Sequence, residues 1–101
     1  MTTILVIDDD ESLRDTIGLM LEQEGYRPLL AADGKTGYER ALTVKPDLIL
    51  VDLRLPGMSG IEISKQLRAG HINTPIIVLS VRDTDIMKVK ALDEGADDYL
   101  T

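Results

Sequence analysis

The sequence contains no cysteine, tryptophan or phenylalanine, and its only aromatic residues are three tyrosines. Without cysteine the chain can form neither disulfide bonds nor a thiolate metal site, which suits a reducing compartment. So few aromatic side chains argue against a stacking platform for single-stranded nucleic acid. No apolar run approaches the roughly 18 residues that span a bilayer, and no basic segment precedes the first apolar run. We therefore expect a cytoplasmic protein that does not contact membranes.

The chain is also poor in positive charge. It has 11 basic and 18 acidic residues, which gives a formal net charge of −7 at pH 7. Domains that bind nucleic acids through their phosphate groups usually present a basic face. We therefore expect no direct binding of nucleic acid by this chain. Its 101 residues are enough for one domain with a modest core, and too few for a second domain.

Short apolar runs alternate with amphipathic stretches along the whole chain. The runs have strand length and are rich in branched residues, so we expect strands at 4–7, 26–32, 47–51, 75–79 and 98–101. Between them we expect a helix capped by Asp9 or Asp10 and stopped at Gly25, a second helix at 34–44, and a third from Ser59 or Gly60 to Ala69. We expect a fourth helix that is capped by Asp83 or Thr84 and ended by Gly95. The first helix has one apolar stripe, formed by Leu13, Ile17, Met20 and Leu21. The residues expected to face inward are Tyr38, Ala41 and Leu42 in the second helix, and the buried seam of the third is formed by Ile63 and Leu67.

This alternation predicts an α/β fold with a parallel sheet and right-handed crossovers. We expect a flavodoxin-like, doubly wound sheet of five strands in the order 2-1-3-4-5, with the strand that contains Pro28 at an edge. In this order the first helix covers one face of the sheet and the next three cover the other. Since one helix cannot cover five strands, we expect a further helix after Thr101, which the domain 1–101 lacks.

Acidic residues follow two of the predicted strands. Asp8 and Asp9 come directly after the first strand, and Asp52 comes directly after the third. In the predicted order these strands are neighbours, and ligands bind outside the carboxyl ends at such a reversal of winding. Three close carboxylates repel one another, so either some of their pKa values rise or a hard cation neutralises them. With no nitrogen or sulfur ligand nearby, the cation that we expect is Mg²⁺. An aspartate in such a site can accept a phosphoryl group, whereas a lone residue such as Asp10 more often caps a helix.

Three stretches carry a resemblance to a known family. They are the first strand with its acidic residues, the segment that begins at Asp52, and the end of the fourth strand: ILVIDDD at 4–10, DLRLPGMSG at 52–60 and VLS at 78–80. With these motifs the chain resembles, over its whole length, the receiver domain of bacterial two-component response regulators. The segment LDEGADDYL at 92–100 resembles regulators that carry winged-helix, DNA-binding output domains.

The resemblance implies roles for the acidic residues. A partner sensor histidine kinase would supply the phosphoryl group that Asp52 accepts. The side chains of Asp8, Asp9 and Asp52 and the backbone carbonyl of Arg54 would hold Mg²⁺. The chain would catalyse only its own phosphorylation and dephosphorylation, so it would not be an enzyme with a separate substrate.

The resemblance also implies a switch that turns phosphorylation into a change of surface. The hydroxyl of Ser80 would move toward the new phosphoryl oxygens, and the ring of Tyr99 would enter the space that it leaves. The surface of the fourth helix and fifth strand would then change. This changed surface would act on an output domain outside this chain, and two phosphorylated copies would pair through it. The family's active-site lysine, the first residue of a Lys-Pro pair, would follow Thr101.

Two other functions are compatible with the acidic residues. A phosphohydrolase with an aspartate nucleophile also takes a phosphoryl group onto an Asp at a strand end, but such enzymes usually have a second Asp two residues later, where this chain has Arg54. A binding module could hold a cation with the same carboxylates and transfer no phosphoryl group. These two alternatives stay open at the level of the sequence.

Overall fold

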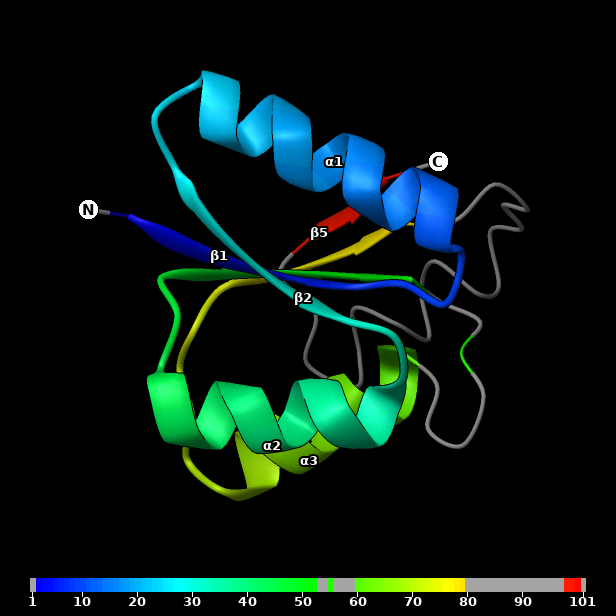
Figure 1. Cartoon of the computed structure of the whole chain (residues 1–101). Helices are drawn as coiled ribbons and strands as arrows, with labels where there is room; N and C mark the ends of the chain where they lie inside the picture. The colour runs from blue at the N-terminus through cyan, green and yellow to red at the C-terminus, as the bar shows by residue number, and fades with distance from the viewer. Residues whose placement is uncertain (1, 53–54, 56–59, 80–97, 101) are drawn as a thin grey trace.

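The computed structural model describes residues 2–52, 55, 60–79 and 98–100 of the chain. Its elements form three layers: α1 lies on one side of a central sheet, and α2 and α3 lie on the other (Figure 1). In chain order they are β1 (Thr3–Ile7), α1 (Glu11–Gln23), β2 (Arg27–Ala31), α2 (Gly34–Val44), β3 (Leu48–Asp52), α3 (Gly60–Ala69), β4 (Ile76–Leu79) and β5 (Asp98–Leu100).

The sheet has the predicted strand order. Its strands run β2-β1-β3-β4-β5, and every neighbouring pair is parallel. The chain is therefore wound in both directions from β1, and β2, which contains Pro28, is an edge strand as expected. The predicted α/β fold is confirmed. The helix predicted between residue 83 and Gly95 lies outside the described residues.

Local chemistry sets the ends of the first two helices. Asp10, one of the two predicted caps, accepts a hydrogen bond from the backbone N–H of Leu13 at 3.0 Å and so begins α1. After α1 the chain turns at Gly25, whose φ of 87° suits glycine. Asp33 caps α2 in the same way, by accepting from the N–H of Thr36 at 2.7 Å. None of the helices in the described part of the chain is long and apolar enough to cross a membrane.

The two faces of the sheet are covered unequally. Facing α2 and α3, the alternate side chains of β3 and β4 are fully buried, at 0% exposure: Ile49, Val51, Ile76 and Val78. The residues between them point to the side of α1 and are only half-buried: Leu48, Leu50, Ile77 and Leu79. The main core thus lies between the sheet and the α2–α3 layer, and the predicted inward residues of α3, Ile63 and Leu67, belong to it.

Part of the predicted helix faces is wrong. Leu42 of α2, expected to face inward, is 38% exposed. In the apolar stripe predicted for α1, Leu13 and Met20 are 45% and 59% exposed. The buried residue of α1 is instead Gly18, where an added Cβ would lie 3.2 Å from Cδ2 of Leu30 in β2. α1 thus approaches β2 through a glycine, and the described neighbours cover only part of its apolar arc. Periodicity shows where an apolar arc lies, and not how wide the covering surface is.

Candidate functional site

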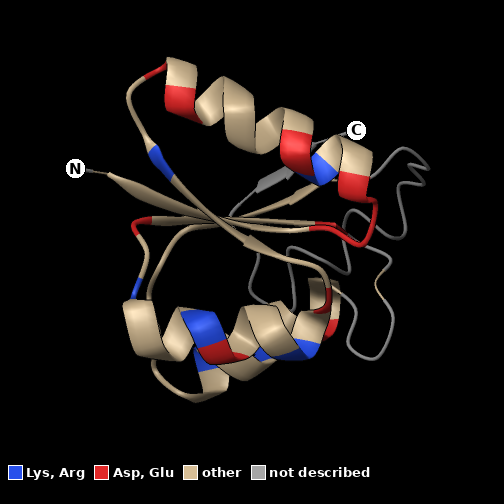
Figure 2. Cartoon of the chain, viewed as in Figure 1, with Lys and Arg blue, Asp and Glu red and all other residues tan. Residues whose placement is uncertain are grey.

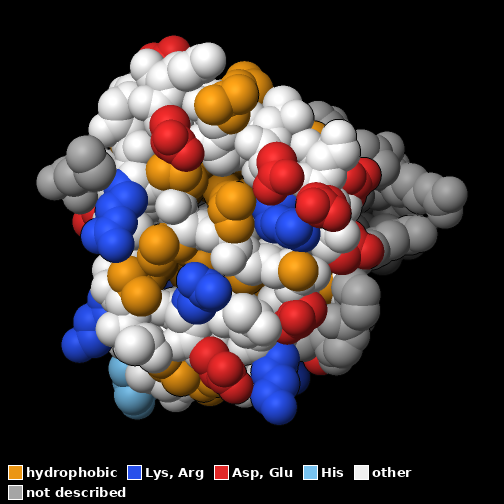
Figure 3. Space-filling view, viewed as in Figure 1, with side chains coloured by type: hydrophobic (Ala, Val, Ile, Leu, Met, Phe, Trp, Pro, Cys, Tyr) orange, Lys and Arg blue, Asp and Glu red, His pale blue; other side chains and the backbone are white. Residues whose placement is uncertain are grey.

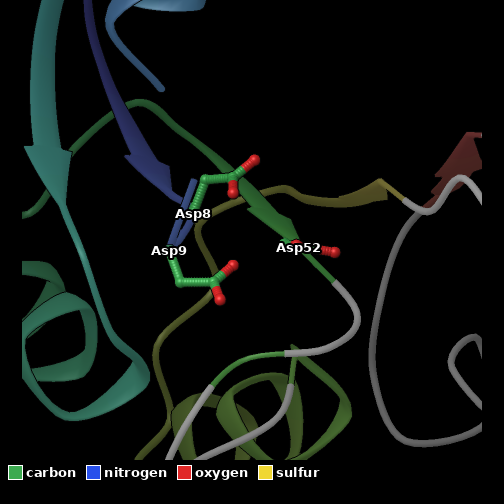
Figure 4. A group of neighbouring side chains, drawn as sticks. All are labelled: Asp8, Asp9 and Asp52. Atoms are coloured by element: carbon green, nitrogen blue, oxygen red, sulfur yellow. The ribbon is translucent and has the colours of Figure 1, made fainter. Parts of the chain in front are cut away.

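Three carboxylates meet where β1 and β3 end. The two strands pair in parallel with Ile7 opposite Val51, so the residues that follow, Asp8 and Asp52, emerge at the same edge of the sheet. Asp9 comes next in the chain, and an oxygen from each of the three side chains lies within 4.8 Å of the others. Figure 4 shows these side chains gathered beside the strand ends, and Figure 2 shows acidic segments at this edge. The fold thus brings together the three aspartates that the sequence singles out.

Backbone contacts fix the first of these aspartates. The N–H of Asp8 donates to the carbonyl oxygen of Ala31 in β2 at 3.0 Å, which continues the β1–β2 ladder beyond the end of the strand. The N–H of Asp10 donates to Oδ1 of Asp8 at 2.9 Å, which holds the carboxylate against its own turn. Asp8 is 3% exposed. Asp9 is exposed and Asp52 half-buried, so the site runs from the sheet edge to the surface.

The electrostatics of the site are unfavourable when no cation is bound. Burial raises the pKa of Asp8 above 3.8, and the negative charges of Asp9 and Asp10 raise it further. The hydrogen bond from the N–H of Asp10 and the positive charge of Arg14 lower this pKa in part. The protein therefore holds Asp8 in a position where its charged form is disfavoured, which a positive ligand would relieve.

These residues fit a divalent, oxygen-preferring cation. The cluster consists of carboxylates alone, and Mg²⁺ and Ca²⁺ prefer oxygen ligands while softer metals favour nitrogen and sulfur. Mg²⁺ usually keeps several waters and takes one or two carboxylates, so oxygens within 4.8 Å of each other can contact one ion directly or through its water shell. One half-buried and one exposed aspartate also leave the site accessible to a phosphate group.

The structure does not describe the side chains of the other predicted site residues. Arg54, whose carbonyl was expected to bind the metal ion, and Ser80, the expected switch hydroxyl, lie outside the described residues. For Tyr99 the structure describes the backbone, which pairs with Val78 of β4 in the fifth strand. The roles of all three stay predictions.

One described residue beside the site is not among those predicted from the sequence. Nη1 of Arg14, in α1, donates a hydrogen bond to the backbone carbonyl oxygen of Asp8 at 3.1 Å. The only sequence signal is its spacing, because Arg14 lies one helical turn after the cap Asp10 and so on the side of the helix near that turn. Arginines with this spacing are common on helix surfaces, so the spacing alone predicts nothing.

A sequence model of the family described as "Response regulator receiver domain" matches residues 4–101 of this chain. The chain belongs to the response regulator receiver domain family. The acidic edge of the sheet therefore occurs in a receiver domain, and the resemblance that the sequence motifs indicated is confirmed.

Curated relatives of this receiver domain are regulators of transcription and signalling. The chain is 45% identical over 98 residues to the alkaline phosphatase synthesis transcriptional regulatory protein PhoP of Bacillus subtilis, and the match covers 97% of this chain and 41% of PhoP. It is 42% identical over 101 residues to the sensory transduction protein RegX3 of Mycobacterium tuberculosis, covering 100% of this chain and 44% of RegX3. The receiver domain thus spans less than half the length of these relatives.

Solved receiver domains have the same fold. The receiver domain of the Francisella response regulator 1452 is similar with a TM-score of 0.95 and 38% identity, over 100% of this chain and 84% of that one. The chemotaxis protein CheY4 of Vibrio cholerae is similar with a TM-score of 0.94 and 30% identity, over 100% and 86% of the two chains. Both support the flavodoxin-like, doubly wound sheet predicted from the sequence.

Proposed function

We propose that this receiver domain is a phosphorylation-dependent signalling switch in which Asp52 accepts a phosphoryl group in a reaction that needs Mg²⁺. The observation that carries the proposal is the convergence of Asp8, Asp9 and Asp52 at the ends of two neighbouring parallel strands. Asp52 ends β3 and is half-buried, so its carboxylate is held by a central strand and is still accessible. Asp8 and Asp9 lie on the adjacent strand end, where they can hold a cation beside it.

The chemistry is a transfer between two nucleophiles. An oxygen of Asp52 bonds to phosphorus while the bond from phosphorus to a histidine nitrogen of a sensor kinase breaks, and the imidazole leaves and takes up a proton. Bound Mg²⁺ would neutralise negative charge on the phosphoryl oxygens. The carboxylates of Asp8 and Asp9, with the backbone carbonyl of Arg54, would hold the ion in place. The chain then acts only on its own phosphorylation and dephosphorylation.

The output is proposed to be a surface. Ser80 and Tyr99 would be the residues that respond to the phosphoryl group, and the surface around the fourth helix and β5 would change with them. A DNA-binding output domain outside this chain would read that change, consistent with relatives more than twice as long, and phosphorylated copies could pair through the same surface. With a net charge of −7, the receiver domain itself is a poor partner for nucleic acid, and we place it in the cytoplasm.

Acetyl phosphate with Mg²⁺ can replace the kinase in a test of this function. We expect the intact protein to gain the mass of one phosphoryl group and to lose it over a measurable lifetime. The rate of phosphate release should not exceed the rate at which the phosphorylated protein decays. Asp52→Asn should gain no phosphoryl group, whereas Asp15→Asn, an exposed aspartate on α1, should behave as wild type. Rapid continuous release of phosphate would indicate a phosphohydrolase instead. Mg²⁺ binding without any phosphoryl transfer would indicate a cation-binding module.

A further inference from the structure

The side chain of Arg14 contacts the backbone between the two acidic residues that follow β1. Its Nη1 donates to the carbonyl oxygen of Asp8 at 3.1 Å, and this carbonyl belongs to the peptide unit that joins Asp8 to Asp9. Arg14 is half-buried and is the only basic residue of α1. Figure 2 shows the basic segment of α1 close to the acidic segment after β1, and Figure 3 shows acidic and basic side chains next to one another on this face.

We propose that Arg14 is a positioning residue for the metal site: by holding the Asp8–Asp9 peptide it sets where the Asp9 carboxylate lies, and so tunes the affinity for Mg²⁺. This inference rests on the proposed function, since it assumes that these aspartates hold a cation. It goes beyond that function because Arg14 is not one of the expected ligands and is proposed to act through its hydrogen bond to the backbone.

The turn after β1 shows why such a contact matters. Asp8 is fixed by its N–H to Ala31 at 3.0 Å and by its carboxylate, which accepts from the N–H of Asp10 at 2.9 Å. Asp10 is in turn fixed as the cap of α1. Asp9 lies between these two and is exposed, so packing does not hold its side chain. Its position follows from the orientation of the peptide plane that precedes it, and Arg14 binds the oxygen of that plane.

The alternative is that Arg14 acts only through its charge. A positive group near a cation site repels the cation, so removal of the charge alone would make Mg²⁺ bind more tightly. Removal of a positioning contact would make Mg²⁺ bind more weakly, because partners that orient metal ligands typically contribute about tenfold or more to affinity. The two explanations therefore predict opposite signs for the same substitution.

The test is a calorimetric Mg²⁺ titration of the whole chain, with the initial rate of phosphorylation by acetyl phosphate measured at each Mg²⁺ concentration. For Arg14→Met we expect the half-saturating Mg²⁺ concentration to rise about tenfold, with a plateau rate near that of wild type. Arg27→Met is the matched control. Arg27 is exposed and begins β2, so it lies at the amino ends of the strands, away from the carboxyl ends that form the site. The half-saturating Mg²⁺ concentration of Arg27→Met should stay within about twofold of wild type. A lost contact that only destabilised the fold would change the melting temperature without shifting half-saturation.

Arg14→Lys keeps the charge and one donor, so we expect a Mg²⁺ affinity between those of wild type and Arg14→Met. It also serves if Arg14→Met does not fold. Unchanged or tighter Mg²⁺ binding by a folded Arg14→Met would overturn the positioning role, as would Arg14→Lys binding as weakly as Arg14→Met. If Arg14→Met is unfolded, a Mg²⁺ affinity of Arg14→Lys equal to that of wild type overturns the positioning role. Failure of wild type and Arg27→Met to bind Mg²⁺ would instead overturn the proposed function.

Discussion

The carboxylate cluster should lower the stability of the protein whenever no cation is bound, and Asp8→Asn tests this. Asparagine has nearly the shape of aspartate, and its side-chain oxygen can still accept from the N–H of Asp10. Two unit charges 4.8 Å apart repel by about 1 kcal/mol in water and by roughly 3 kcal/mol at the effective dielectric constant of a protein surface. Since Asp9 is exposed, we expect the lower end, a gain of about 1 kcal/mol for Asp8→Asn.

The assay is thermal unfolding in the presence of a chelator. For a chain of this size, about 1 kcal/mol corresponds to a rise in melting temperature of about 4–8 °C. Asp15→Asn changes the net charge equally at an exposed position of α1 and is the matched control. Excess Mg²⁺ should then raise the melting temperature of wild type more than that of Asp8→Asn. A bound ion stabilises the folded state in proportion to its affinity, and wild type, with all three carboxylates, should bind Mg²⁺ more tightly.

The effect has a defined pH dependence. The pKa of Asp8 is raised in the folded protein, mainly by burial, so its unfavourable contribution is present above that raised pKa. As the pH falls through the raised pKa toward 3.8, Asp8 takes up a proton and the difference between wild type and Asp8→Asn should shrink. Equal melting temperatures of Asp8→Asn and Asp15→Asn in chelator at neutral pH would refute the reasoning.

Two further predictions concern the fold that supports the site. Gly37→Ala should destabilise the protein by about 1–3 kcal/mol in urea unfolding, because its Cβ would lie 2.4 Å from Cδ1 of the buried Ile7; Gly18→Ala, whose Cβ would meet only the flexible end of a leucine at 3.2 Å, should stay close to wild type. Asp33→Ala should lower the melting temperature at neutral pH, because Asp33 caps α2, and hydrogen bonds from Thr36 lower the pKa of Asp33 below 3.8. This loss should be complete above pH 3.8 and should fade as the pH falls through the lowered pKa; a loss that persists at the lowest pH would contradict it.

The strand order and the acidic site could be predicted because both follow from rules that act along the chain. Apolar runs that alternate with amphipathic helices define a parallel sheet, and a parallel sheet places all carboxyl ends of its strands on one edge. Asp8 and Asp52 therefore had to meet once β1 and β3 were neighbours, which the pairing of Ile7 with Val51 confirms. The cap Asp10 and the turn at Gly25 followed from residue type in the same way.

The rest depends on contacts between elements, which periodicity does not report. Leu13 and Met20 belong to the apolar arc of α1, yet they are exposed, and the buried residue of this helix is Gly18. Gly37 lies so close to Ile7 that an added Cβ would be 2.4 Å from Cδ1 of Ile7, and nothing in the sequence distinguishes it from a helix-weakening glycine. The contact of Arg14 with the Asp8 carbonyl is likewise a consequence of where α1 lies.

The central claim is that Asp52 accepts a phosphoryl group in a site formed with Asp8 and Asp9. The most direct measurement is to treat the protein with acetyl phosphate and Mg²⁺, reduce it with borohydride, and locate the modified residue by peptide mass spectrometry. Borohydride converts a phosphorylated aspartate to homoserine, and we predict homoserine at position 52 only when both acetyl phosphate and Mg²⁺ are present. Homoserine at another position, or at position 52 in equal amount without Mg²⁺, would contradict the account.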